Sequence, residues 1–416
     1  MELKRVVVTG LGALTPIGNT IEEYWNGLIT GKSGAAPITH FDASKFKTQF
    51  ACELKNFNVE DYIHRKDARR LDNFSQYAMV SAMEAMADSK LMESNPNLDR
   101  IGVIWGSGIG GIKTFQEEHS DFIQGDGTPK INPFFIPKMI ADIAAGHISI
   151  HYGLRGPNYA TVSACASSTN AIIDAYNLIC LGKSDAIVTG GSEAAVTEMG
   201  VGGFTAMKAL SVRNDSPETA SRPFDKDREG FVLGEGAGAL ILEEYEHAVK
   251  RGAKIYAEVA GAGMSSDAHH ITAPHPEGIG ARNVMIEALA DANMKPEDVD
   301  YVNVHGTSTP LGDIAEIKAI KAVFGESAYN LNISSTKSMT GHLLGAAGAI
   351  EAIACILSVQ NDIVPPTINH FTDDPEIDSK LNLTFNTAQK RTVNVALSNT
   401  FGFGGHNTSA IFKKFK

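Results

Sequence analysis

Three side chains that can do chemistry each stand in or beside a turn of small residues. Cys165 lies within the run 161–170, Thr-Val-Ser-Ala-Cys-Ala-Ser-Ser-Thr-Asn. His305 ends an apolar stretch and is followed by a glycine, whereas His342 closes the hydroxyl-rich run 334–342. A thiol suits acyl transfer from thioesters, because thiolate and thioester exchange at little cost in free energy. The three residues together therefore predict a site for acyl transfer.

The sequence after Cys165 predicts a buried helix over 171–180, since Ala, Ile and Leu occupy several of its faces. Cys165 would then stand near a helix N-terminus, where unpaired N–H groups and the helix dipole stabilise an anion. This placement predicts a thiolate with a pKa below that of a free thiol, about 8.5. The alternative is a cysteine that serves as a small buried hydrophobic residue, as most unpaired cysteines do.

Two histidines and a nearby lysine favour the catalytic interpretation. One histidine at a strand end is more often structural, but two in glycine- and hydroxyl-rich turns, with Cys165 and Lys337, indicate a shared site. Two neutral imidazoles can donate hydrogen bonds to one carbonyl oxygen and so stabilise an enolate, such as a malonyl group forms on losing CO2. The backbone N–H groups of Cys165 and of a residue in 402–405 would form a second donor pair, which would hold the oxyanion of the tetrahedral intermediate. By its spacing alone, Lys337 fits a structural ion pair equally well.

Composition and charge restrict the class of protein. The 416 residues include 36 Lys and Arg against 48 Asp and Glu, a net charge of −12 that argues against general nucleic-acid binding. No apolar run is long enough to cross a bilayer, and Met1 leads directly into an apolar strand rather than a signal peptide. The four cysteines, at 52, 165, 180 and 355, lack metal-ligand spacing. We therefore expect reduced thiols in a cytoplasmic protein that contacts neither membrane nor nucleic acid.

Strands and helices alternate along the chain, which indicates an α/β architecture with layered sheets. The expected strands include 6–12, ending in a glycine turn, and 101–105, 185–191, 255–260, 301–306 and 393–397. The expected helices include 63–87, 282–293 and an apolar, small-residue helix over 343–359. The turn and helix that follow residue 334 resemble those around Cys165, which predicts a duplication with halves at 1–250 and 251–416.

A rival interpretation comes from residues 106–111, which fit the dinucleotide fingerprint G-x-G-x-x-G after a strand. Asp126 lies at about the distance where the fingerprint needs an acidic residue. The residues before and after it, however, form a loop that extends to 137, where a second strand should end in that acid. The context disfavours an oxidoreductase, whose signature would be tight binding of NAD(H).

Two charged clusters each have two interpretations. The run 65–70, Arg-Lys-Asp-Ala-Arg-Arg, is either a solvated helix face or a docking patch for an acidic partner. The second cluster has the residue types of a metal site without the usual ligand spacing, and consists of Asp267, His269, His270 and His275. We expect a loop and no bound metal at the second cluster.

Four motifs together resemble those of the elongating β-ketoacyl-[acyl-carrier-protein] synthases, and the resemblance extends from Val6 to Phe412. The motifs are 163–167 (Ser-Ala-Cys-Ala-Ser), 305–310 (His-Gly-Thr-Ser-Thr-Pro), 335–342 (Ser-Thr-Lys-Ser-Met-Thr-Gly-His) and 401–405 (Phe-Gly-Phe-Gly-Gly). Residues 108–111 and 265–270 are similar to the synthase II subtype. The resemblance implies a thiolase-like, duplicated α/β fold, a five-layer αβαβα sandwich, in a homodimer. It implies a decarboxylative Claisen condensation of a Cys-bound acyl group with malonyl-[acyl-carrier protein], the elongation step of fatty acid biosynthesis, without a cofactor.

The resemblance also implies a role for each residue at a matching position. Cys165 would carry the acyl chain, and His305 and His342 would bind the malonyl thioester carbonyl. Lys337 would order the site electrostatically. Phe403 would be a gate, and Phe401 and Ile109 would shape the acyl pocket. The phosphopantetheine arm would be bound by Thr307, Thr309 and Thr272. The acidic carrier protein would dock on Lys66, Arg69, Arg70 and Lys208.

Other members of the wider superfamily fit the sequence less well. Thiolases use a second cysteine as base, but Cys355 lies inside an apolar stretch. Initiating synthases pair Cys with His and Asn, where this chain has His342. A non-catalytic carrier-binding partner would not retain Cys165 and both histidines. A ketosynthase of a specialised polyketide or aryl-polyene pathway stays open, as do the acyl chain length and the effect of His406, which stands where many relatives have Thr.

Overall fold

The computed structural model describes residues 3–415 and contains one sheet of ten strands and two sheets of two strands. In spatial order, the large sheet contains β10 (Asn332–Ser334), β9 (Tyr301–Asn303), β13 (Val395–Gly402), β14 (His406–Lys413), β8 (Ala257–Ser266), β1 (Val6–Leu14), β7 (Gly236–Glu244), β6 (Ala186–Glu193), β4 (Ile101–Gly106) and β5 (Asn158–Thr161). The small sheets pair β2 (Ala36–Pro37) with β3 (Phe50–Ala51) and β11 (Ile363–Val364) with β12 (Gln389–Lys390).

The large sheet has the same pairing pattern on either side of its middle. β5, β4 and β6 pair in parallel, β7 pairs antiparallel with β6, and β1 pairs antiparallel with β7. Likewise, β10, β9 and β13 are parallel, and β14 and β8 follow antiparallel. β1 and β8 pair antiparallel at the centre. All strands of the first half-sheet precede residue 245 and all strands of the second follow residue 256.

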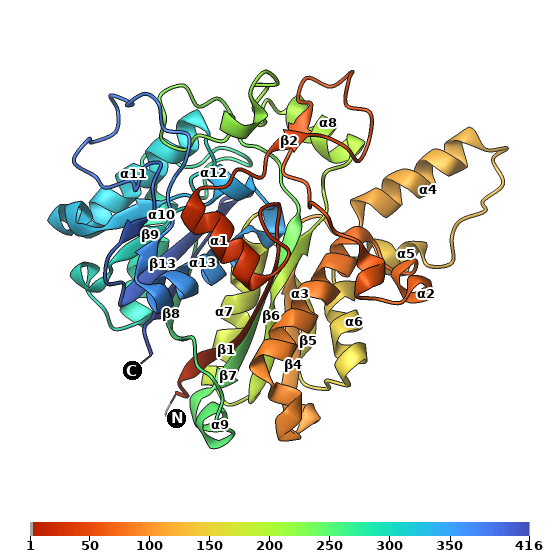
Figure 1. The fold of residues 1–416 in the computed structure, drawn as a ribbon, viewed down its shortest axis with the longest axis horizontal. Helices are drawn as coiled ribbons and strands as arrows, with labels where there is room; N and C mark the ends of the chain where they lie inside the picture. Colours follow the sequence, from red (N-terminus) through yellow and green to blue (C-terminus); the bar gives the residue numbers. More distant parts are fainter. Residues whose placement is uncertain (1–2, 416) are drawn as a thin grey trace.

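Helices cover the outer faces of the two half-sheets and fill the space between them (Figure 1). The central helices α7 (Ser167–Cys180) and α13 (Ala347–Asn361) pack against each other and against strands of both halves. The outer layers are α3 (Asn73–Ser89) with α6 (Ile143–Tyr152) on the first half, and α10 (Ile279–Asp291) with α11 (Pro310–Phe324) on the second. The predicted thiolase-like α/β fold is therefore confirmed.

The other helices are short or peripheral. They are α1 (Ile21–Thr30), α2 (Arg65–Ala68), α4 (Ile112–Gln124), α5 (Phe135–Met139), α8 (Glu198–Ala206), α9 (Tyr245–Lys250) and α12 (Lys337–Thr340). In α1 the ends follow ordinary capping chemistry: the Thr20 side chain accepts the Glu23 N–H, and Gly31 stops the helix with a φ of 71°.

Small residues let the two central helices approach closely. A Cβ on Gly348 of α13 would overlap Oγ1 of Thr169 in α7. The Ala349 N–H donates to Oγ of Ser168 at 2.9 Å across the same contact. Within residues 3–415, one helical stretch, Leu344–Asn361, is long and apolar enough to cross a membrane, and 89% of it is buried inside the protein. Its apolar character is that of a core helix.

Several element ends differ from the expected ones. β1 continues through the predicted glycine turn at 10–12, because Gly10 and Gly12 leave room for α3: a Cβ on either would overlap a carbonyl oxygen of that helix. The helix expected over 63–87 is split into α2 and α3, and that expected over 343–359 begins at Ala347 after a 3₁₀ turn. β13 extends to Gly402, so the expected glycine-rich turn is limited to 403–405.

We expect Gly12→Ala to lower the free energy of unfolding by about 2 kcal/mol, because its Cβ would press on the Ser81 carbonyl oxygen of α3. Urea denaturation followed by circular dichroism measures the change. Gly203→Ala in α8 is the matched control, since a Cβ there has no heavy atom within 4 Å. Equal stability of the two variants would show that the approach of α3 to β1 does not require glycine.

Candidate functional site

One cavity of about 430 Å³ contains the three reactive groups predicted from the sequence. Cys165, His305 and His342 all line it. Cys165 and His305 each follow the carboxyl end of a parallel strand, β5 and β9, and such ends are where ligands bind in α/β sheets. The structure thus brings together groups from both halves of the chain.

Hydroxyl groups hold the turn that presents Cys165. Thr161 Oγ1 donates to the Ser167 carbonyl at 2.7 Å, and Ser167 Oγ donates to the Ala164 carbonyl at 2.6 Å. Ser167 Oγ also accepts the Ser163 N–H at 3.0 Å. Ala164 has a φ of 50°, a left-handed conformation that residues with a Cβ rarely adopt. The hydrogen bonds stabilise this strained turn and place Cys165 two residues before α7, near a helix N-terminus as expected.

Burial opposes the thiolate that this placement predicts. It raises the pKa of the Cys165 thiol to about 12, while the charge of Lys337 and the backbone N–H of Phe403 act in the other direction. The expected low pKa is therefore wrong for the free enzyme, because desolvation outweighs the cationic and backbone groups nearby. The protonated thiol is therefore the favoured form of Cys165 at neutral pH.

Glu316 of α11 fixes the backbone beside His305. The N–H groups of His305 and Gly306 donate to the two oxygens of this carboxylate at 2.9 and 2.8 Å. Burial raises the pKa of Glu316 to about 7, and these two hydrogen bonds oppose the rise. The His305 imidazole packs beside the Phe401 ring, with centroids 5.6 Å apart. His305 is therefore held through its main chain and through its ring.

His342 contacts Cys165 directly, since its Nε2 lies 3.0 Å from Cys165 Sγ. Its own backbone is held by the segment before β7: the His342 N–H donates to the Val232 carbonyl at 2.7 Å, and its carbonyl accepts the Gly234 N–H at 2.9 Å. The His305 and His342 rings are nearly perpendicular, at 87°, with centroids 5.2 Å apart. The thiol and both imidazoles thus form one cluster.

Both imidazoles of the site are neutral. Burial lowers the pKa of His305 and of His342 well below the ordinary value, and the charge of Lys337 lowers both further. A neutral imidazole carries one N–H. The cluster can therefore donate two N–H groups to a carbonyl oxygen without any prior change of protonation.

Lys337 is buried and forms an ion pair with Glu351 of α13. Burial raises the pKa of Glu351 to about 7, and Lys337 opposes the rise. The two interpretations of this lysine, electrostatic and structural, are compatible. The ammonium group has an ion-pair partner and also disfavours a positive charge on either imidazole.

The turn at 403–405 lies beside the nucleophile. Gly402 packs so closely that a Cβ there would lie 2.7 Å from the Ser163 carbonyl oxygen. Phe401 and Phe403 line the cavity, as the acyl-pocket and gate interpretations require. Ile109 is not among the described residues that line it; it stands on the loop after β4 and is 41% exposed.

The predicted threonines lie together and the predicted basic residues do not. Thr307 and Thr309 share a hydrogen bond of 3.1 Å between their hydroxyls and line the cavity with Thr272 and Lys208. The other basic residues are exposed on and just after α2, which lies apart from α8 in Figure 1, and comprise Lys66, Arg69 and Arg70. The structure therefore places Lys208 apart from the other three predicted docking residues.

The glycine-rich loop at 106–111 binds a carboxylate of the chain itself. Glu193 is fully buried and accepts the N–H groups of Gly108 and Ile109 at 2.8 and 3.1 Å. Asp126 lies in the loop after α4 and not at the end of a second strand. Because the N–H groups that would bind a pyrophosphate are already engaged, the dinucleotide interpretation is wrong.

The cluster at 267–275 consists of loop residues at the cavity wall. His270 Nδ1 accepts the N–H groups of Thr272 and Ala273, each at 3.1 Å, and Asp267 accepts the Asn407 amide at 2.9 Å. Nowhere in residues 3–415 do three or more His, Cys, Asp or Glu side chains gather as a metal site would require.

Sequence reasoning missed three buried glutamates that support the site, Glu193, Glu316 and Glu351. For Glu351 a signal existed, because it is the one charged residue in the apolar run 343–359, and a buried charge needs a partner. Glu193 and Glu316 gave no comparable signal. The first ends a strand, and the second lies in a helix with other charged residues.

Comparison with known proteins agrees with this geometry. Residues 3–248 match the β-ketoacyl synthase N-terminal domain, and residues 256–371 match the C-terminal domain. The chain is 51% identical over 418 residues to 3-oxoacyl-[acyl-carrier-protein] synthase 2 of Synechocystis sp., covering 100% of this chain and 99% of that protein. It is 52% identical over 413 residues to the protein of the same name from Staphylococcus aureus, covering 99% of each.

Solved structures show the same architecture. A β-ketoacyl synthase from Burkholderia phymatum superposes with a TM-score of 0.91 at 36% identity, covering 99% of this chain and 100% of that one. The ishigamide ketosynthase/chain length factor superposes with a TM-score of 0.92 at 34% identity over 100% of both chains.

The full-length identity to the synthases 2 decides the activity. The chain is an acyltransferase that condenses an acyl group with a malonyl-derived unit in the elongation step of fatty acid biosynthesis, and the fatty-acid interpretation holds over the specialised-pathway alternative. The prediction of the synthase II subtype is confirmed, and proteins of this kind work with an acyl carrier protein. The chain belongs to the β-ketoacyl synthases, because it matches both domains of this family and is similar to family members over its whole length.

Proposed function

We propose that Cys165, His305 and His342 divide the two half-reactions of the condensation. The observation that carries this proposal is the 3.0 Å contact between Cys165 Sγ and His342 Nε2, in a cavity that also holds the His305 imidazole. In the first half-reaction Cys165 attacks the thioester of an acyl-loaded carrier protein. A bond forms between Sγ and the acyl carbon, the bond to the pantetheine sulfur breaks, and the thiol proton ends on that sulfur.

In the second half-reaction the malonyl thioester carbonyl accepts the N–H groups of His305 and His342. The bond to the carboxylate breaks, CO2 leaves, and the electron pair remains as an enolate that the two neutral imidazoles stabilise. The enolate carbon attacks the acyl carbonyl, whose oxyanion accepts the backbone N–H groups of Cys165 and Phe403. The Cys165 sulfur leaves and takes a proton from solvent, which gives 3-oxoacyl-[acyl-carrier protein] and the free thiol.

Lys337 acts in this proposal through its charge. A buried ammonium near both imidazoles makes an imidazolium costly, so the two histidines stay hydrogen-bond donors in both half-reactions. The same charge favours the Cys165 sulfur when it becomes anionic. The ion pair with Glu351 keeps the ammonium in place.

The acyl chain and the phosphopantetheine arm occupy different parts of the site in this proposal. Phe403 is the gate between the half-reactions, and Phe401 and Ile109 shape the acyl pocket. The hydroxyls of Thr307, Thr309 and Thr272 bind the arm, which their positions in the cavity wall support. The reaction uses the chain's own groups and requires no cofactor or metal.

We propose that the acidic carrier protein docks on the basic residues Lys66, Arg69, Arg70 and Lys208, and that the enzyme works as a homodimer. β5 ends the large sheet and is half exposed, which supports pairing with a second copy. Large exposed apolar side chains in the same part of the sequence also support an interface, and include Phe115, Ile123, Phe134, Ile136, Tyr159 and Val162.

Two further expectations stay proposals of the same kind. The repeated strand pairing supports the division into duplicated halves at 1–250 and 251–416. The four unpaired cysteines support a cytoplasmic, reducing environment.

Incubation with a long-chain acyl-[acyl-carrier protein] should raise the intact mass of the protein by one acyl group, because Cys165 forms the thioester. The measurement is intact-mass spectrometry, and Cys165→Ala should show no increase. Acylation of the folded Cys165→Ala variant, or none of the unchanged protein, would contradict the role of this residue.

Cys165→Gln should retain malonyl decarboxylation, and its rate should change by less than about twofold between pH 8 and pH 6. Burial holds the pKa of both imidazoles well below about 6.5, the ordinary histidine value, so both stay neutral over this range. Glutamine resembles the acylated cysteine, so condensation is lost while the two N–H donors remain. Release of CO2 from malonyl-[acyl-carrier protein] measures the rate. A fall with an apparent pKa near 6.5 would mean that the imidazoles titrate normally.

Charge reversal of Lys66, Arg69 and Arg70 to Glu should raise KM for carrier-bound substrates about tenfold at low ionic strength, with less effect at high salt. Steady-state kinetics at two salt concentrations measure it. The matched control reverses three other exposed lysines, Lys183, Lys250 and Lys390. If both triple variants behave alike, the α2 cluster is a solvated helix face and nothing more.

A further inference from the structure

The turn that carries Thr307 and Thr309 contains strained backbone. Ser308 between them has a φ of 66°, a conformation in which a residue with a Cβ is rarely found. Phe224, in the segment that packs against this turn, has a φ of 68° and a still larger side chain. Such conformations persist only where the surroundings hold them.

Main-chain groups of the segment 222–230 hold part of this turn. The Arg222 N–H donates to Ser308 Oγ, and the Gly230 N–H donates to the Ser308 carbonyl, both at 3.0 Å. The Phe224 N–H donates to a carboxylate oxygen of Asp313 at 2.9 Å. Hydrogen bonds therefore connect the segment of Phe224 with Ser308, and Phe224 itself with Asp313 just after the turn.

A single side chain contacts two carbonyls at the end of the turn, where α11 begins. Arg228 donates from Nε to the Thr309 carbonyl at 3.2 Å and from Nη2 to the Pro310 carbonyl at 3.1 Å. Its side chain is only 4% exposed. It is not among the described residues that line the cavity, although the next two residues, Glu229 and Gly230, are. Arg228 therefore acts on the cavity through the turn.

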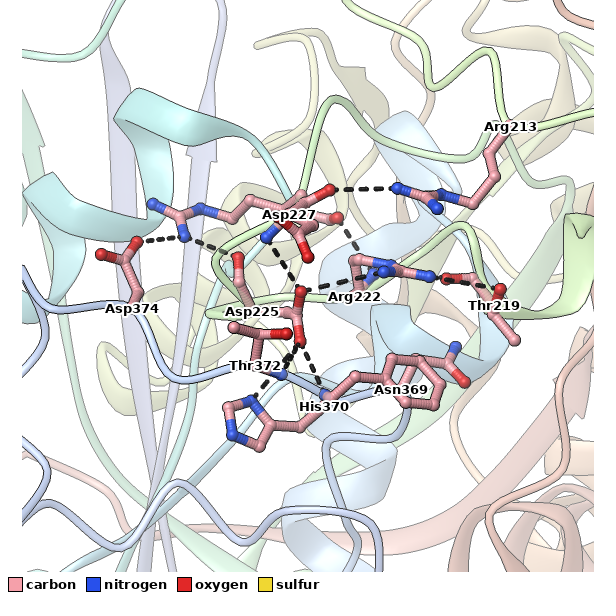
Figure 2. Close-up of polar contacts among 12 residues, drawn as sticks. Arg213, Thr219, Arg222, Asp225, Asp227, Asn369, His370, Thr372 and Asp374 are labelled. Carbon is pink, nitrogen blue, oxygen red and sulfur yellow. Dashed lines mark hydrogen bonds and ion pairs between the residues drawn. The ribbon is translucent and has the colours of Figure 1, made fainter.

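Buried carboxylates balance the charge of Arg228 and connect it to a distant segment. Nη1 lies 2.6 Å from Asp374, and Nε lies 3.6 Å from Asp313. Figure 2 shows how the segment of Asp374 is held: the carboxylate of Asp225 accepts the N–H groups of Phe371 and Thr372, at 2.6 and 2.8 Å. Three segments far apart in sequence thus meet around one guanidinium.

We propose that Arg228 is a positioning residue for the phosphopantetheine arm, because it fixes the turn whose two threonine hydroxyls face the cavity. The inference rests on the proposed role of Thr307 and Thr309. A planar guanidinium is needed here, since its N–H groups donate in different directions to three carbonyls and to the Asp374 carboxylate. The third carbonyl is that of Asp225, 2.8 Å from Nη1. Lysine keeps the charge but cannot span these carbonyls.

The test compares Arg228→Lys with a matched control, Arg100→Lys. Arg100 also donates to two turn carbonyls, of Gly182 and Lys183, and pairs with Asp185, but the turn that it contacts does not line the cavity. We expect Arg228→Lys to raise KM for malonyl-[acyl-carrier protein] about tenfold and to change kcat by less than about twofold. Decarboxylation of malonyl ethyl thioester, which has no pantetheine arm, should be unchanged in both variants.

A purely structural role of Arg228 would lower activity toward both substrates by the same factor, and that result, or an unchanged KM, would overturn the proposal. If Arg228→Lys does not fold, Asp374→Asn tests the same point, since it loosens one side of the guanidinium without replacing any residue of the turn itself. It should raise KM for the carrier-bound substrate in the same selective way, and an unchanged KM in the folded variant would contradict the inference.

The double variant Thr307→Ala with Thr309→Ala separates this inference from the function on which it rests. If the double variant raises KM and Arg228→Lys does not, the inference alone is wrong. If the double variant leaves KM unchanged, the arm-binding role of the threonines fails and the inference fails with it.

Discussion

The close packing of α7 against α13 is the constraint on which the site depends. Cys165 stands two residues before α7, and His342 stands five residues before α13. The distance between nucleophile and imidazole is thus set by how near the two helices lie, and Gly348 allows that approach because a Cβ there would overlap Thr169. Each half of the chain supplies one of these helices. The fold therefore brings together, in one site, two turns that lie far apart in the sequence.

The same packing buries charge, and this explains the protonation of the site. Glu351 enters the core on α13 and meets Lys337, so each of these two buried groups has a partner. Because the pair lies near the imidazoles, an added positive charge on either is disfavoured by desolvation and by Lys337 together. The ion pair and the neutral imidazoles are two consequences of one buried arrangement.

How far the sequence predicts this structure depends on the range of each interaction. The α/β layers and the positions of Cys165, His305 and His342 in turns follow from local patterns of apolar and small residues. Two other features do not follow from local patterns, because each depends on a partner far along the chain. The strand through Gly10 and Gly12 depends on α3, and the function of the glycine loop at 106–111 depends on Glu193. The thiol pKa was mispredicted for the same reason, since burial is a property of the whole fold.

Strained residues mark how far the site extends. Ala164 beside Cys165 and Ser308 between the threonines both have a Cβ and a positive φ. The Ala164 carbonyl accepts the Ser167 hydroxyl from the start of α7, and the Ser308 hydroxyl accepts the Arg222 N–H from a neighbouring segment. A strained turn relaxes when one of its hydrogen bonds is lost, so Ser167 and Arg222 influence geometry at the cavity without lining it. In the proposed function the site is therefore larger than the set of residues that touch substrate, and it includes buried charged groups in the layers behind the cavity wall.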